Sequence, residues 1–146
     1  MRILTVRQPW AWAIIHGGKD VENRARNLAG DYRGPIAIHA GLAAYEQGNM
    51  GSRAHRAAHG TETETRIDFG AIIGVVDLVG VHRTQGNGEC RPAGLGWCSP
   101  WAESGDVWHL VIADPRPLIT PIPFKGALGL RTLPADIEAA IREQVK

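Results

Sequence analysis

Residues 70–81 read GAIIGVVDLVGV, and this stretch is almost continuously apolar. A run of this length, rich in β-branched residues, is typical of a central strand that is buried on both faces of a sheet. Asp77 is its only charged residue. Because an unpaired charge is costly to bury, Asp77 is expected to have a partner, and a lysine or arginine from residues 19–24 is a candidate.

Shorter segments on both sides of this stretch have the pattern of strands. They are residues 3–6, 35–40 and 107–113. Proline cannot donate to a strand ladder, so Pro115 and Pro117 are expected to end the last of them. In residues 35–40, the alternation of strand side chains places His39 on the face opposite to Ile36 and Ile38.

The C-terminal part of the chain predicts one more strand and a helix. Residues 121–130 are extended and interrupted by glycine, which suits the bends by which a short strand closes a small barrel. Pro134 then opens a helix with one apolar stripe, formed by Ile137, Ala140 and Ile141. Several short strands with few helices favour a mostly β (α+β) fold, a small β-barrel with peripheral helices.

Length and charge limit the classes of function. At 146 residues the chain is expected to be a single domain over residues 1–146, with long loops near residues 42–68 and 83–106. Its net charge of +1 provides no global basic field, so a nucleic-acid site has to be a local patch. No signal-peptide core or membrane-length apolar run is present, which predicts a cytoplasmic protein without a membrane partner. The oligomeric state stays open.

The two cysteines, Cys90 and Cys98, lie in a stretch rich in glycine and proline. They lack the CxxC spacing of a zinc knuckle. The sequence therefore predicts no metal and no cofactor.

The segment GGKDVENR at residues 17–24 is the main candidate for a functional site. Residues 9–16 before it predict a short helix, which the two glycines end. If residues 20–25 continue as a strand, Glu22 and Arg24 share one face and Lys19 can reach it. The alternative is a plain ion-pair network on a strand edge, worth at most about 1 kcal/mol per exposed pair.

These charged groups have complementary chemistry. Lys19 can bind a phosphate or, if it is desolvated, act as a base. Arg24 can hold a phosphate with two hydrogen bonds, and Glu22 can accept a proton from water or from a ribose 2′-hydroxyl. His39 is a further candidate for a general acid or base, although a lone strand histidine is more often structural.

Two tryptophans and a basic segment can contribute to binding. Trp10 and Trp12 point in diverging directions on a helix, so at least one is expected to be partly exposed and available for base stacking. Arg53 and Arg56 lie in a stretch without acidic residues that can follow a phosphate backbone. The alternative is core packing for the tryptophans and a solvated surface for the arginines.

Several motifs together resemble one known family, the ASCH domain, named for activating signal cointegrator homology. They are LTVRQPWA at residues 4–11, GxKxxExR at 17–24, YRGPIAIHA at 32–40, GVVD at 74–77 and PIPFKGALGL at 121–130. The resemblance covers nearly the whole chain apart from its two long loops. Arg131 stands where the family often has tryptophan.

The resemblance implies a PUA-like fold related to RNA-binding modules, with a ligand site beside the first helix. It implies that Gln8, Pro9, Trp10 and Trp12 contribute to that site together with Lys19 and Arg24. Family members are RNA-binding modules, coactivator appendages or hydrolases, including ribonucleases and amidohydrolases of N4-acetylcytidine. The amidohydrolase branch carries a threonine thought to be the nucleophile at the position of Glu22.

These observations predict a protein that binds RNA or a nucleoside-like small molecule. Lys19, Glu22, Arg24 and His39 are the candidate catalytic residues of a metal-independent hydrolase acting on RNA. The alternatives are an amidohydrolase of a modified nucleoside and a non-enzymatic module that reads RNA or binds another protein.

Overall fold

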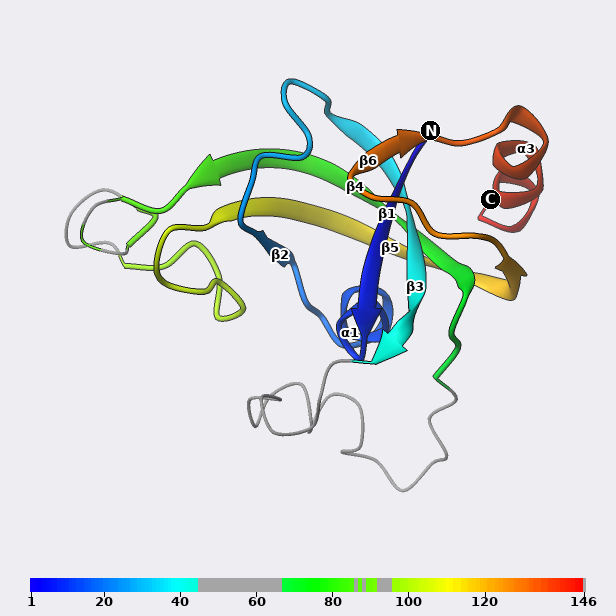
Figure 1. The fold of residues 1–146 in the computed structure, drawn as a ribbon, viewed down its shortest axis with the longest axis horizontal. Coiled ribbons are helices and arrows are strands. Elements are labelled where there is room, and N and C mark those ends of the chain that lie inside the picture. Colours follow the sequence, from blue (N-terminus) through cyan, green and yellow to red (C-terminus); the bar gives the residue numbers. More distant parts are fainter. Residues whose placement is uncertain (45–66, 86, 88, 92–95, 146) are drawn as a thin grey trace.

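A computed structural model describes residues 1–44, 67–85, 87, 89–91 and 96–145. Within these ranges, neither helix has the length and hydrophobicity needed to cross a membrane. The elements in chain order (Figure 1) are β1 (Arg2–Gln8), α1 (Trp10–His16), β2 (Val21–Arg24), β3 (Gly34–Ala44), β4 (Ala71–Arg83), β5 (Trp108–Pro123), β6 (Leu130–Thr132) and α3 (Ala135–Gln144).

The strands of the described residues form one six-stranded sheet in the order β2-β5-β4-β3-β1-β6. β1 and β3 are parallel, and the other neighbouring strands are antiparallel. The long strands β4 and β5 curve across the molecule (Figure 1). The predicted mostly β fold with peripheral helices is confirmed.

The predicted closure of the sheet into a barrel is wrong, because the sheet has two unpaired ends at β2 and β6. Residues 121–130 do not form one closing strand. Pro121–Pro123 belong to the end of β5, and Leu130 begins the three-residue β6. Edge strands of three and four residues offer too few backbone groups to pair across the gap and close the barrel.

The expectation that Pro115 and Pro117 end a strand is also wrong, since both lie inside β5. The pairing of β4 with β5 shifts register between Val75 and Asp77 and again between Ile72 and Gly74. Proline fits such irregular positions because it does not have to donate to the ladder there. The neighbouring strand β2 pairs with β5 only as far as Val111, so both prolines also lie beyond that ladder.

Apolar side chains are buried on both faces of the sheet. Ile36 and Ile38 of β3 pack in one cluster with Ile14 of α1, whereas Ala37 packs in a second cluster with Ile141 of α3. Because neighbouring strand residues point to opposite faces, α1 and α3 cover opposite faces of the sheet. The predicted burial of residues 70–81 on both faces is confirmed for Ala71–Val76 and Leu78. It is wrong for the end of the run, where Val79 is 55% exposed and Gly80 and Val81 are only partly buried.

Asp77 has a charged partner, but not the predicted one from residues 19–24. Its carboxylate lies 2.7 Å from the guanidinium of Arg116 on the neighbouring strand β5. Both side chains are about one-third exposed. A cross-strand neighbour therefore satisfies the charge, and solvent still reaches it.

We expect Asp77→Asn to lower the free energy of unfolding by no more than about 1 kcal/mol, because partly exposed ion pairs are weak. Urea denaturation of both proteins measures the difference. Asp106→Asn is the matched control, since Asp106 pairs with Arg83 at a more exposed position. A loss well above that of the control, about 3 kcal/mol, would mean that the Asp77 pair behaves as a buried one.

Candidate functional site

The candidate site begins where α1 ends. The carbonyl of Ala13 accepts hydrogen bonds from the backbone N–H groups of Gly17 (2.9 Å) and Lys19 (3.0 Å). Gly18 has a φ of 71°, a left-handed conformation that glycine adopts without strain. This turn brings the chain back beside the helix, so that Lys19 lies between α1 and β2.

Lys19 and Glu22 form a buried ion pair. The two residues are 4% and 8% exposed, and Lys19 Nζ lies 2.9 Å from Glu22 Oε2. The ammonium group also donates a hydrogen bond to the backbone carbonyl of Val21. The three residues do form an ion-pair network on an edge strand, but the Lys19–Glu22 pair is not exposed, because both of its charges are removed from water. The value of at most about 1 kcal/mol for an exposed pair therefore does not apply to it.

Arg24 lies at the partly exposed end of this pair. Its Nε is 3.0 Å from Glu22 Oε1, so the carboxylate of Glu22 lies between two cations. One terminal nitrogen of Arg24 donates to the backbone carbonyl of Thr5, at 2.8 Å. With 27% of its side chain exposed, Arg24 is the most accessible charge of the three.

Two tryptophans flank the ion pair. Lys19 Nζ lies 5.8 Å from the centre of the Trp10 ring, within the range of a cation–π contact. The rings of Trp10 and Trp101 meet edge to face, with their centres 6.3 Å apart. Both indoles are only partly buried, so aromatic surface and positive charge lie next to each other.

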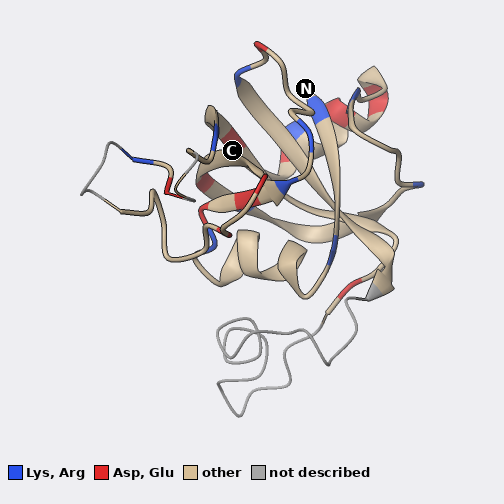
Figure 2. Ribbon diagram, turned by 60° about the vertical axis from the view of Figure 1, so that its left-hand side comes forward, with Lys and Arg blue, Asp and Glu red and all other residues tan. Residues whose placement is uncertain are grey.

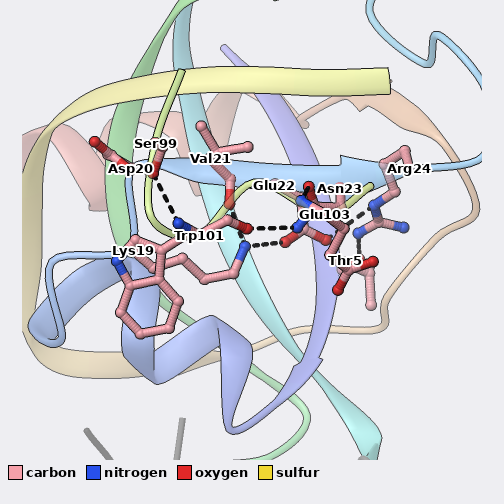
Figure 3. A network of polar contacts seen from close by, with 10 residues as sticks. All are labelled: Thr5, Lys19, Asp20, Val21, Glu22, Asn23, Arg24, Ser99, Trp101 and Glu103. Carbon is pink, nitrogen blue, oxygen red and sulfur yellow. Dashed lines mark hydrogen bonds and ion pairs between the residues drawn. The ribbon is translucent and has the colours of Figure 1, made fainter. Parts of the chain in front are cut away.

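Residues 99–103 lie along β2 and hold this part of the site (Figure 3). Ser99 Oγ donates to the carboxylate of Asp20, and Asn23 Nδ2 donates to the carbonyl of Trp101 at 3.0 Å. The backbone N–H of Glu103 donates to Asn23 Oδ1, also at 3.0 Å. These residues of the long loop, like Thr5, were not among the site residues predicted from the sequence. No spacing in the chain connects residues 99–103 with β2.

His39 is not brought together with Lys19. Glu22 lies opposite Leu110, which belongs to the cluster on the α1 face, whereas His39 points to the other face of the sheet. The ring is 1% exposed, and its Nε2 lies 2.8 Å from the carbonyl of Phe124. This position is that of a structural histidine, which fixes the segment between β5 and β6.

Gln8 and Pro9 lie at the start of α1. Gln8 is buried. Its side-chain oxygen accepts a hydrogen bond from the backbone N–H of Trp12, and its side-chain nitrogen donates to the carbonyl of Asp68. Both polar groups of the amide are therefore bonded within the protein. Pro9, which follows a cis peptide bond, is the residue before the first turn of α1.

The remaining predicted binding residues do not meet Lys19 in the described part of the chain. Trp12 packs against His16, away from Lys19. Arg53 and Arg56 lie outside the described residues.

Charges of both signs are interspersed over the described part of the fold (Figure 2). At the site itself, Lys19 and Arg24 contribute two positive charges against one negative charge on Glu22. Asp20 next to them is exposed and is bonded to Ser99. With Asp20 counted, these four charges cancel, so the site offers an anion the directed hydrogen bonds of the partly exposed Arg24 and no excess of positive charge. The molecule as a whole also has no basic surface that would attract a long polyanion.

Comparison with solved structures identifies the fold. No protein-family model and no curated protein sequence matches the chain. The crystal structure of ASCH from Zymomonas mobilis superposes with a TM-score of 0.55 at 17% identity, covering 99% of this chain and 95% of that one. A tyrosine-to-phenylalanine mutant of that protein has a TM-score of 0.59 at 16% identity, with 99% and 98% covered.

A serine-to-alanine mutant of the same protein gives a TM-score of 0.56 at 16% identity, with 99% and 96% covered. Each superposition extends over both helices and the whole described sheet, since nearly all of both chains is covered. The predicted resemblance is therefore confirmed at the level of the fold: this chain has the fold of the ASCH domain.

Proposed function

We propose that this protein binds short single-stranded RNA or a nucleoside-like ligand at Lys19, Glu22, Arg24 and Trp10. The observation that carries the proposal is a partly exposed indole next to a buried ion pair whose accessible end is an arginine. An indole can stack on a base, and a guanidinium can hold a phosphate with two hydrogen bonds. The small net charge favours a compact ligand over a long polyanion.

The buried ion pair supports this proposal, because removing two charges from water costs free energy of folding. Two buried charges seldom add to stability, since their desolvation offsets most of their attraction. Desolvated charge clusters are enriched at functional sites. Trp10 packs against Trp101, and hydrogen bonds from Asn23 to Trp101 and from Glu103 to Asn23 tie the long loop to β2, the strand that carries Glu22 and Arg24.

Equilibrium binding of a labelled single-stranded RNA oligonucleotide, and separately of nucleosides and nucleotides, tests the proposal. We expect Arg24→Gln to weaken binding by about tenfold or more, the effect of losing a charge-assisted hydrogen-bond pair. Arg26→Gln is the matched control, because Arg26 is exposed two residues away and carries the same charge. Equal affinity of the Arg24→Gln and Arg26→Gln proteins would contradict the proposed site.

A second candidate function, hydrolysis of RNA, is favoured by the position of the Glu22 carboxylate between two cations. In its first step the 2′-hydroxyl attacks phosphorus, its proton passes to Glu22, and the bond from phosphorus to the 5′-oxygen breaks, which leaves a 2′,3′-cyclic phosphate that water opens in a second step. Lys19 gives a proton to the leaving oxygen, and Arg24 stabilises the charge on phosphorus.

Incubation with RNA and with N4-acetylcytidine, with and without a chelator, tests this second function. Hydrolysis by the proposed residues alone predicts product in the presence of the chelator and none from Glu22→Gln. The folded state of that variant, and of the protein in the presence of the chelator, is checked by circular dichroism. Binding without product from either substrate would leave a non-enzymatic RNA-binding module.

Replacing Arg53 and Arg56 tests whether the basic segment that contains them contributes to RNA binding. If both contact phosphates, replacing both with alanine is expected to lower the slope of log affinity against log salt concentration by about 1.4, or about 0.7 per phosphate of a single strand. Binding measured at several salt concentrations gives the slope. An unchanged slope would remove this segment from the proposed interface.

A further inference from the structure

A second cluster of side chains lies away from Lys19, at the end of the β4–β5 hairpin. The ligand atoms of His82, Cys90, Cys98 and His109 all lie within 4.8 Å of one another. The two histidines are directly opposite each other on β4 and β5, and the two cysteines come from the segment that joins these strands. His109 is fully buried, and the other three are partly buried.

The distances within the cluster match those of a tetrahedral metal site. His109 Nδ1 lies 3.3 Å from His82 Nε2 and 3.6 Å from Cys98 Sγ. Zinc bonds of about 2.0–2.1 Å to nitrogen and about 2.3 Å to sulfur, at tetrahedral angles, separate two nitrogens by about 3.4 Å and a nitrogen from a sulfur by about 3.6 Å. One ion can therefore lie within bonding distance of these three atoms.

The surrounding hydrogen bonds prepare the ligand atoms for a cation. His109 Nε2 lies 2.9 Å from the carbonyl oxygen of Glu103, which can only accept, so the ring proton is on Nε2. The lone pair of Nδ1 then faces the other ligand atoms, as in metal sites whose histidines are oriented by a second partner. The backbone N–H of Cys98 donates to Cys90 Sγ at 2.9 Å, which fixes the position of that sulfur beside the other ligand atoms.

We propose that His82, Cys90, Cys98 and His109 bind one zinc ion that fixes the connection between β4 and β5. Two thiolates and two imidazoles are the donor set of structural zinc sites, and four protein ligands leave no open position for a substrate. Cys90 and Cys98 lack the CxxC spacing of a zinc knuckle, but this site does not need that spacing. Strand pairing places the two histidines opposite each other, and the connecting segment brings the two cysteines to them.

Such an ion would also support the neighbouring candidate site. Cys98 is followed by Ser99, which bonds to Asp20, and Glu103 is bonded both to His109 and to Asn23. The zinc proposal itself rests on the geometry of the cluster and does not depend on the proposed function.

Metal analysis of untagged protein, purified under reducing conditions and supplied with zinc, tests the proposal. We expect about one zinc per chain, and less than about a tenth of an equivalent in Cys90→Ser and in Cys98→Ser. His16→Asn is the control, since His16 lies on α1 away from the cluster and should not affect zinc content. Cobalt in place of zinc should give the visible spectrum of a tetrahedral ion and a thiolate-to-cobalt charge-transfer band.

A measurement on the unmodified protein covers the case in which the cysteine variants do not fold. Both thiols should react slowly with a thiol reagent, and their reaction rate should rise when a chelator is added. The chelator should also lower the Tm of the protein. Protein that binds neither zinc nor cobalt would overturn the proposal, as would a Cys90–Cys98 disulfide in protein that holds no metal. Full zinc content in a folded Cys98→Ser protein would also overturn it.

Discussion

Lys19→Ala is expected to lower the free energy of unfolding by about 3–5 kcal/mol, the cost of leaving a buried charge without its partner. Glu22 would remain 8% exposed with only Arg24 near it, and the carbonyl of Val21 would lose the ammonium that donates to it. Urea denaturation measures the change. It would be a large part of the stability of a domain of this size.

Two further variants show whether the loss comes from the unpaired carboxylate. The double variant Lys19→Met with Glu22→Leu removes the buried pair and keeps the volume, and it leaves Arg24, whose side chain is 27% exposed, without its partner Glu22. It should therefore recover part of the stability lost in Lys19→Ala. Lys125→Ala, at an exposed lysine, should change stability by less than about 0.5 kcal/mol. A Lys19→Ala protein as stable as the Lys125→Ala protein would show that the pair is solvated in solution.

The buried pair also limits how Lys19 can be used in activity assays. A loss of turnover in Lys19→Ala would not separate a missing catalytic group from a partly unfolded protein. Arg24→Gln is the better probe, because Arg24 is partly exposed. Glu22→Gln keeps the shape of the carboxylate but leaves the buried ammonium of Lys19 without its counter-ion. Each activity measurement therefore needs the unfolding curve of the same variant beside it.

Trp10→Ala is expected to weaken the binding of single-stranded RNA by about 1–3 kcal/mol, which is about 5- to 150-fold, because one base loses its stacking surface. The ring of Trp10 lies beside Lys19 and against Trp101, so its removal opens the site on one side. Fluorescence anisotropy with a labelled oligonucleotide measures the affinity. The conservative variant Trp10→Phe should retain part of it.

Trp12→Ala is the matched control, since it makes the same change in the same helix. Its ring contacts His16 and lies away from Lys19, so we expect its affinity for RNA to stay within about twofold of the unmodified protein. Equal losses in Trp10→Ala and Trp12→Ala would mean that the helix, and not the stacking surface, supports binding. That result would exclude Trp10 as a base platform.

Patterns along the chain were sufficient to predict most of the elements. The helix before Gly17, the strand from residue 71 and the C-terminal helix after Pro134 are all present in the structure. The charged segment of residues 19–24 was also identified correctly as a place where Lys19, Glu22 and Arg24 meet. These features depend on residues a few positions apart, whose relative directions follow from the helical or strand repeat.

Two predictions failed where long-range contacts compete with local preferences. Pro115 and Pro117 were expected to end a strand, but bulges in the β4–β5 pairing accommodate them. Closure of a barrel was expected from residues 121–130, but β6 contains only three residues. In both cases the result depends on the partner strand, which the local sequence does not specify.

Local patterns predicted most of the strands and helices, the apolar faces and the charges that meet at residues 19–24. Contacts between distant segments bury the Lys19–Glu22 pair, place Trp101 against Trp10 and bring Cys90 and Cys98 to the two histidines of the β4–β5 hairpin. Side-chain direction follows from backbone repeats over a few residues, whereas burial and contact between distant residues depend on strand order, register and the paths of the connections.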